Sequence, residues 1–273
     1  MDPHLEQQVT ELQLQLREAQ AQLTLYAKDL RRVWVREREQ AHALRAATLQ
    51  LQAFAKDLRT SYEAEKRKSR ELEHTHYESL LRLTRAMRYK DDESAGHSER
   101  LSHYTKVIAL HLGLGNQEAD LIAAASPMHD VGKIGVPYVI LLKAGPLKSE
   151  EWKVMKNHAA LGASLLKGIP SPLLELAGQI ALTHHERWDG SGYPQGLQGE
   201  EIPLAGRIVM LADQYDALRS IRPYKVAFTH EHTYDIVLNG DSHTLPQHFE
   251  PRLLEVFRDV HPELRTIYDQ LDA

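Results

Sequence analysis

Residues 23–33 read Leu-Thr-Leu-Tyr-Ala-Lys-Asp-Leu-Arg-Arg-Val, with apolar side chains at positions 23, 26, 30 and 33. The same alternation of three- and four-residue steps extends from Leu5 to Leu58. It is the heptad pattern of a coiled coil, because it places one apolar seam along a helix. Neither glycine nor proline occurs between Leu5 and Ala95, so the sequence predicts one long helix here.

The seam predicts a homodimer, since a lone helix would leave it in water. It is interrupted at Glu37 and Gln40, where we expect its weakest part. The segment 23–31 is repeated at 51–59, four heptads later and therefore on the same seam. Two interpretations of this repeat stay open: the drift of coiled coils toward repetition, or a duplicated signalling helix.

Composition excludes several classes of protein. The 273 residues carry a net charge of −5, which argues against a duplex-DNA binder. Cysteine is absent and histidine occurs 16 times, so any metal must be held by His, Asp and Glu. No apolar stretch approaches the ~20 residues that span a bilayer, and we find no secretory signal. We therefore expect a cytoplasmic protein without membrane insertion.

The pattern becomes globular from about His74. Apolar residues recur at helical spacing, glycine and proline mark short loops, and no stretch shows the period-two alternation of a strand. The prediction is an all-α chain with a coiled-coil helix over 1–73 and an all-helical domain over 74–273. We interpret four histidines near the end of this domain as exposed surface residues: His230, His232, His243 and His248.

Histidines and carboxylates gather at five places along the predicted domain. Each follows an apolar run or shares a helical turn with another, where an unpartnered polar group would be costly. The candidate metal ligands are Glu93, His97, His129, Asp130, His158, His184, His185 and Asp213. Eight nitrogen and oxygen ligands suit two or three ions such as iron or manganese. Closely spaced ions of this kind favour phosphoester hydrolysis, and no Walker-type glycine loop is present.

Several motifs resemble the HD-GYP family of bacterial cyclic di-GMP phosphodiesterases. They are His129-Asp130, His184-His185-Glu186, Asp189-Gly-Ser-Gly-Tyr-Pro194, Ala212-Asp-Gln-Tyr-Asp-Ala217, Arg222-Pro-Tyr-Lys225 and Phe249-Glu-Pro251. The resemblance covers about residues 74–273. The order and separation of the eight candidate ligands also match the family, and the Glu93–His97 pair resembles members with a third metal.

This resemblance implies a metal-dependent phosphodiesterase with residues in named roles. Asp130 would bridge the ions, and a bridging water or hydroxide would attack cyclic di-GMP to give linear pGpG or GMP. Lys133, Arg222 and Lys225 match family positions that contact the phosphates or guanine, with Lys133 beside the reacting group. Asp216 matches a position near the base or supporting Arg222. The Gly190–Pro194 loop would shape the pocket or serve as a partner-docking surface.

Two other functions remain open. One is a cyclic dinucleotide sensor that turns over negligibly and signals through the coiled coil. The other is an enzyme for a different substrate, either a mixed guanine–adenine cyclic dinucleotide or a linear dinucleotide. The sequence does not distinguish guanine from adenine recognition.

Overall fold

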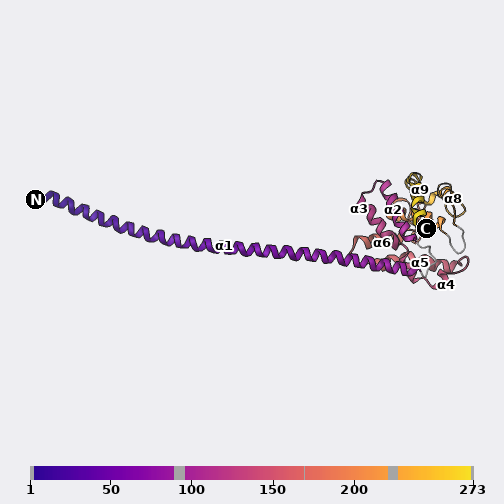
Figure 1. Ribbon diagram of the computed structural model, residues 1–273, viewed down its shortest axis with the longest axis horizontal. Helices are drawn as coiled ribbons and strands as arrows, with labels where there is room; N and C mark the ends of the chain where they lie inside the picture. The colour runs from indigo at the N-terminus through magenta and orange to yellow at the C-terminus, as the bar shows by residue number, and fades with distance from the viewer. Residues whose placement is uncertain (1–2, 89–95, 169, 221–226, 272–273) are drawn as a thin grey trace. The chain divides into compact units, whose positions relative to one another are not determined.

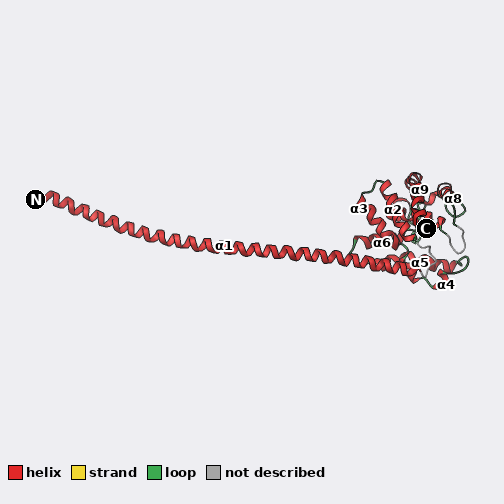
Figure 2. Cartoon of the chain, in the orientation of Figure 1, coloured by secondary structure: helices red, strands yellow, loops and turns green. Residues whose placement is uncertain are grey.

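The computed structural model describes residues 3–88, 96–168, 170–220 and 227–271. All regular secondary structure in these residues is helical, as Figure 2 shows, so the all-α prediction is confirmed. Contacts divide the chain into two compact units, Met1–Leu72 and Glu73–Ala273.

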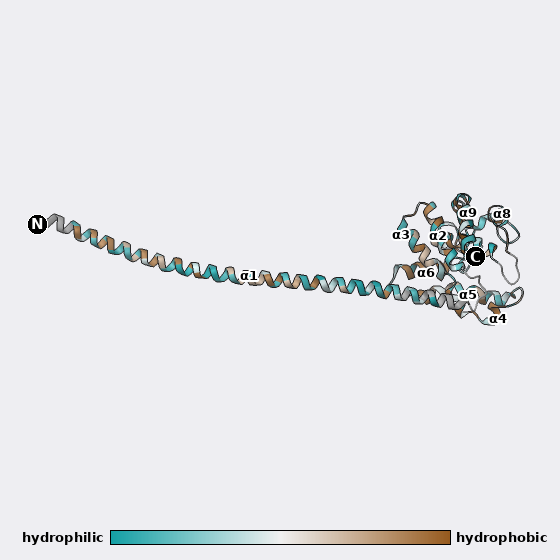
Figure 3. Cartoon of the chain, in the orientation of Figure 1, coloured by the Kyte–Doolittle hydropathy of each residue, from teal (hydrophilic) through white to brown (hydrophobic). Residues whose placement is uncertain are grey.

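The predicted long helix is present as α1 (Pro3–Arg88). Figure 3 shows apolar residues interspersed with polar ones along it. Its seam is open to solvent in the single chain: Leu23 is 68% exposed, Leu30 70% and Leu51 68%. Leucine is rarely left so exposed along one continuous stripe. The partner that would cover this stripe stays a prediction.

Besides the last turns of α1, the second unit is built from shorter helices, most of which are labelled in Figure 1. The α-helices are α2 (His97–His111), α3 (Asn116–Ala125), α4 (Tyr138–Leu141), α5 (Ser149–Leu166), α6 (Pro172–Thr183), α7 (Leu204–Arg219), α8 (His230–Asn239) and α9 (Pro251–Leu271). Within the described ranges, four 3-10 turns join them: η1 (Ser126–Met128), η2 (Val131–Gly135), η3 (Gly199–Glu201) and η4 (Pro246–His248).

Helices α2, α6 and α7 form the centre of this unit. Helix α2 packs against α3, α7 and α9, while α6 packs against α3, α5 and α7. Large apolar side chains at these contacts are fully buried, among them Leu101, Ile108, Ile180 and Leu211. Burial of each such side chain contributes roughly 1.5–3 kcal/mol to stability.

Two glycines allow the backbone to approach neighbouring elements closely. A Cβ atom on Gly132 would lie 1.9 Å from the backbone oxygen of His158, so η2 meets α5 without a side chain between them. A Cβ on Gly206 would lie 2.2 Å from Thr183 Oγ1, where α7 meets the end of α6. These contacts bring together the segments that carry the candidate ligands.

The surface interpretation of the late histidines is wrong for two of the four. His230 and His248 are only 4% and 5% exposed, whereas His232 and His243 are exposed. Their burial is explained by polar partners within the fold, which sequence spacing does not show. The Tyr215 hydroxyl and His230 Nδ1 are 2.9 Å apart, and His230 Nε2 lies 2.9 Å from His261 Nδ1.

None of the helices in the described ranges is both long and apolar enough to cross a bilayer.

Candidate metal centre

Seven of the eight predicted ligands gather at one place in the second unit. They come from the start of α2, the η1–η2 junction, α5, the end of α6, and α7. They form two groups, each with ligand atoms within 4.8 Å of one another: Asp130, His158, His184 and His185, and then His97, His129 and Asp213. The eighth, Glu93, lies outside the described residues.

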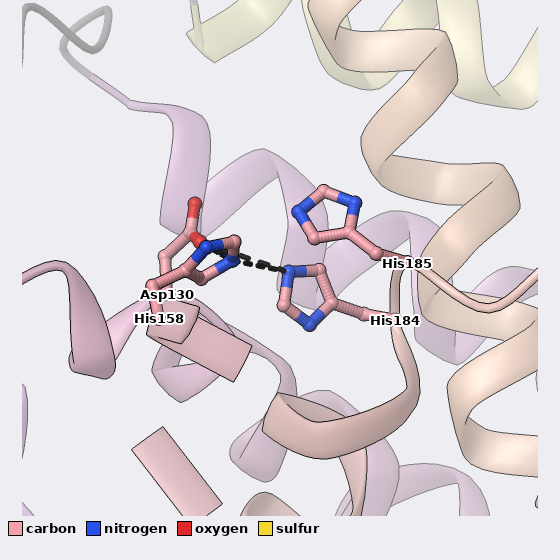
Figure 4. A group of neighbouring side chains, drawn as sticks. All are labelled: Asp130, His158, His184 and His185. Atoms are coloured by element: carbon pink, nitrogen blue, oxygen red, sulfur yellow. Dashed lines mark hydrogen bonds and ion pairs between the residues drawn. The ribbon is translucent and has the colours of Figure 1, made fainter. Parts of the chain in front are cut away.

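In the first group, shown in Figure 4, imidazoles face the Asp130 carboxylate. Asp130 Oδ1 is 3.2 Å from His158 Nε2 and 3.6 Å from His184 Nε2. The His184 and His185 rings lie side by side, with centroids 4.0 Å apart. Because α5 and the end of α6 pack together, residues 26 apart in sequence face one carboxylate.

The second group lies on the other side of the same carboxylate. Asp130 Oδ2 is 3.1 Å from His129 Nε2. Asp213 Oδ1 is 3.6 Å from His97 Nε2 and 4.0 Å from His129 Nε2. The two oxygens of Asp130 therefore face the two groups separately, which is the arrangement of a carboxylate that bridges two ions.

Backbone carbonyls fix the orientation of three rings. The Nδ1–H groups of His129, His158 and His184 donate to the carbonyls of Ser126, Met155 and Ala181 at 2.9, 2.8 and 3.0 Å. Since a carbonyl only accepts, Nδ1 carries the proton in each ring, and in the neutral ring Nε2 presents its lone pair. This is how metal-binding histidines are usually held.

The donor set fits divalent cations. With Nδ1 protonated, His158 Nε2 and His184 Nε2 are acceptors that face another acceptor, Asp130 Oδ1. That oxygen is buried and makes no hydrogen bond among the described residues. Acceptors at 3.2–3.6 Å repel one another unless a cation lies between them. The two groups are thus able to hold metal ions, as predicted.

Electrostatic interactions and burial keep Asp130, His184 and His185 in the protonation states that bind metals. Burial alone would raise the pKa of Asp130, but the Lys133 ammonium, 2.7 Å from Oδ2, together with His129 and His158, outweighs burial and holds that pKa well below its usual value. Burial lowers the pKa of His184, and it holds the pKa of His185 well below the usual value. An ionised carboxylate and neutral imidazoles are the forms that bind metals.

Asp216 contacts the side of the His97 ring that faces away from Asp213. His97 Nδ1 donates to Asp216 Oδ2 at 2.7 Å, and Arg100 donates to both carboxylate oxygens at 2.7 and 2.8 Å. Asp216 is only 1% exposed. This differs from the substrate contact expected for it, because both of its oxygens are engaged inside the core. Carboxylates in this position orient a histidine ligand and raise its basicity.

Sequence reasoning missed the role of Glu186. This carboxylate is 1% exposed and accepts the backbone N–H groups of Gln195 and Leu197 at 2.7 and 3.0 Å. It thereby holds the backbone directly after the predicted docking loop. In that loop the Tyr193 ring stacks on the His185 ring, with centroids 4.6 Å apart. Glu186 directly follows the candidate ligands His184 and His185, and this position was a signal in the sequence that could have indicated a structural role for it. Arg222 and Lys225 lie outside the described residues.

The comparisons agree with this helical metal centre. Residues 82–244 match the model of the HD domain, so the chain belongs to the HD domain family. It is 48% identical over 159 residues to the cyclic di-GMP phosphodiesterase response regulator RpfG of Xanthomonas campestris pv. campestris, covering 58% of this chain and 42% of that protein. It is 40% identical over 197 residues to 3′3′-cGAMP-specific phosphodiesterase 2 of Vibrio cholerae, and the match covers 72% of this chain and 37% of that protein. The resemblance predicted from the sequence is confirmed.

A crystal structure described as cyclic GMP-AMP specific phosphodiesterases of Vibrio cholerae shares the fold, with a TM-score of 0.51 and 19% identity over 72% of this chain and 51% of that chain. The chain spans about two fifths of the length of the two curated relatives.

Proposed function

We propose that this protein is a metal-dependent phosphodiesterase that hydrolyses cyclic di-GMP to linear pGpG, and onward to GMP if a third ion is held. The observation that carries the proposal is Asp130, whose two oxygens face separate histidine-containing groups 3.1–3.6 Å away. Membership in the HD domain family and a 48% identical relative named for cyclic di-GMP hydrolysis support it.

Each group would hold one ion, with Asp130 shared between them. Glu93 together with His97 would complete a third position. Iron and manganese both suit imidazole and carboxylate ligands. When bound, such ions lower the pKa of a coordinated water and offset charge on a phosphoryl group.

The residues of the chain would bind and orient the phosphodiester. Lys133 is 19% exposed in its side chain and lies 2.7 Å from Asp130 Oδ2, so its ammonium can contact a phosphate oxygen next to the ions. Arg222 and Lys225 would contact the remaining phosphate or guanine atoms. In the reaction water forms a bond to phosphorus, the P–O3′ bond breaks, and the leaving oxygen takes a proton.

The remaining assignments concern assembly. We infer that residues 1–73 form a homodimeric coiled coil, supported by the exposed seam of α1, and that residues 74–273 form the phosphodiesterase domain. A protein partner would dock at the Gly190–Pro194 loop. The overall charge of −5 gives no support for DNA as a partner.

The test is a hydrolysis time course. Protein purified without oxygen and loaded with iron or manganese is mixed with cyclic di-GMP, and the products are separated by chromatography. Asp130→Ala, which removes both oxygens that face the groups, is run beside it. We expect pGpG, or GMP, from the parent alone. Equal conversion by both proteins, or by neither, contradicts the proposal.

A mixed guanine–adenine cyclic dinucleotide is the second candidate, favoured by the 40% identity to a relative named for 3′3′-cGAMP. Competition between the two cyclic species decides between them. Tight binding without product, measured by calorimetry, would instead indicate a sensor.

A further inference from the structure

An aromatic wall extends outward from the candidate metal centre. The Tyr193 ring stacks on His185, with centroids 4.6 Å apart and planes 27° apart, and lies 6.4 Å from the His158 ring. The Trp152 ring lies 6.2 Å from Tyr193, at 71°. Trp152 is therefore one ring further from the ligands than Tyr193, and it is 44% exposed.

Lys156 joins these two rings. It follows Trp152 by one turn of α5, so these two side chains share a helix face. Its ammonium nitrogen lies 5.8 Å from the centroid of the Trp152 ring and 5.1 Å from that of Tyr193. The aromatic wall thus combines the rings of Trp152 and Tyr193 with the Lys156 ammonium, which lies close to both.

The chemistry of this wall matches a nucleobase. Bases stack on aromatic side chains, and a half-exposed tryptophan offers the largest such surface. A lysine ammonium only donates, and guanine presents two adjacent acceptors, O6 and N7, on one edge. Adenine places an amino donor where guanine has O6, so the same ammonium favours guanine.

We propose that Trp152 and Lys156, with Tyr193, form a guanine subsite of the cyclic dinucleotide. Trp152 stacks on the base and Lys156 donates to its acceptor edge, while the adjoining phosphate lies at the metal centre. This inference rests on the proposed function, since it assigns the base of the same substrate.

The first arm of the test uses fluorescence. In the variant Trp34→Phe/Trp188→Phe, Trp152 is the sole indole of the full chain. The manganese-loaded variant is mixed with cyclic di-GMP in a stopped-flow instrument, and with inorganic phosphate as the ligand that lacks a base. We expect cyclic di-GMP to quench Trp152 emission and phosphate to leave it unchanged.

The second arm uses steady-state kinetics. Trp152→Leu should raise KM for cyclic di-GMP at least tenfold with kcat within twofold, and Trp152→Phe should restore most of the affinity. Lys156→Met should raise KM for cyclic di-GMP more than for the mixed guanine–adenine species. Lys153→Met is the matched control, because Lys153 lies on the same helix but pairs with Glu150 at 2.9 Å.

The outcomes separate the two proposals. Hydrolysis without quenching, and with an unchanged KM in Trp152→Leu, overturns the subsite and leaves the phosphodiesterase intact. Quenching without hydrolysis supports the subsite and overturns the activity. Neither quenching nor hydrolysis overturns both. A fall in kcat alone in Trp152→Leu shows that Trp152 only supports the metal centre, which also overturns the subsite.

Discussion

The two units of this protein depart from ordinary burial in opposite ways. In α1 the apolar Leu30 is 70% exposed, whereas in the second unit the charged Arg100 is fully buried. Exposed leucines along one stripe predict a partner that covers them, and a buried charge requires an opposite charge or hydrogen bonds beside it. The exposed leucines of α1 concern assembly with a partner. The buried Arg100 concerns the candidate metal centre. Each interpretation can be tested by a single substitution with a matched control.

The largest loss of stability is expected for Arg100→Leu. This change leaves the buried Asp216 carboxylate without the two Arg100 hydrogen bonds at 2.7 and 2.8 Å. Breaking a buried pair costs about 3–5 kcal/mol. Urea unfolding in the presence of a chelator measures it without a contribution from metal binding. The double variant Arg100→Leu/Asp216→Leu should recover part of the loss, because no unpaired charge remains.

The control lies on the same helix. Lys106 pairs with Asp120 at 2.6 Å, but the two side chains are 45% and 59% exposed. Lys106→Ala should therefore cost at most about 1 kcal/mol. Equal losses for Arg100→Leu and Lys106→Ala would show that burial of the charge network has no special importance here.

An effect of comparable size, on dimer association and not on unfolding, tests the outward-facing unit. Leu23 and Leu25 are 68% and 67% exposed in the single chain, but only Leu23 lies on the heptad seam. Leu23→Lys removes two leucines from a dimer, at about 1.5–3 kcal/mol each. The dimer dissociation constant should rise about a hundredfold or more. Sedimentation equilibrium measures it, and Leu25→Lys should leave it near the parental value. The same shift in both variants would contradict the seam.

The two units also differ in what could be predicted from sequence. The heptads of α1 are a local pattern, so the helix was predictable, and the homodimer inferred from its seam stays a prediction. In the second unit, residue type and apolar context picked out candidate ligands, seven of which gather in two groups. Their division around Asp130 could not be predicted, because it depends on how α2, α5, α6 and α7 pack. Asp216 shows the limit clearly. Family resemblance suggested a position near the base or supporting Arg222, and only the tertiary position of Arg100 shows why the Asp216 carboxylate turns inward.

A smaller, local effect is expected for Glu186→Gln. The carboxylate accepts two backbone N–H groups, and an amide can accept with only one of its two terminal atoms. A hydrogen bond to a charged group contributes roughly 1.5–3 kcal/mol. Amide hydrogen exchange at Gln195 and Leu197 should accelerate by about 10- to 100-fold. Glu201→Gln is the control, because Glu201 accepts the exposed Gln198 amide at 3.1 Å. Unchanged exchange in Glu186→Gln would show that the loop is held by other contacts.

The smallest effect is a pH dependence that arises away from the metal centre. Burial, together with the neighbouring His261, Arg219 and Arg265, lowers the pKa of His230 to about 4, although the nearby Glu231 opposes the shift. An unfolded histidine titrates near pH ~6.5. Between these values the unfolded chain binds more protons than the folded one, so stability falls as the pH drops from about 6.5 toward 4. Above this window His230 contributes no such dependence.

The variant His230→Gln separates this contribution from that of the other histidines. Glutamine can accept from the Tyr215 hydroxyl and donate to His261, but it does not titrate. We expect the melting temperature of His230→Gln to fall less between pH 7 and pH 5 than that of the parent. His232→Gln, two residues away on the exposed face of α8, should retain the parental slope. If His230→Gln retains the parental slope as well, the His230–His261 pair does not make the fold sensitive to acid, and the burial of His230 has only a packing role.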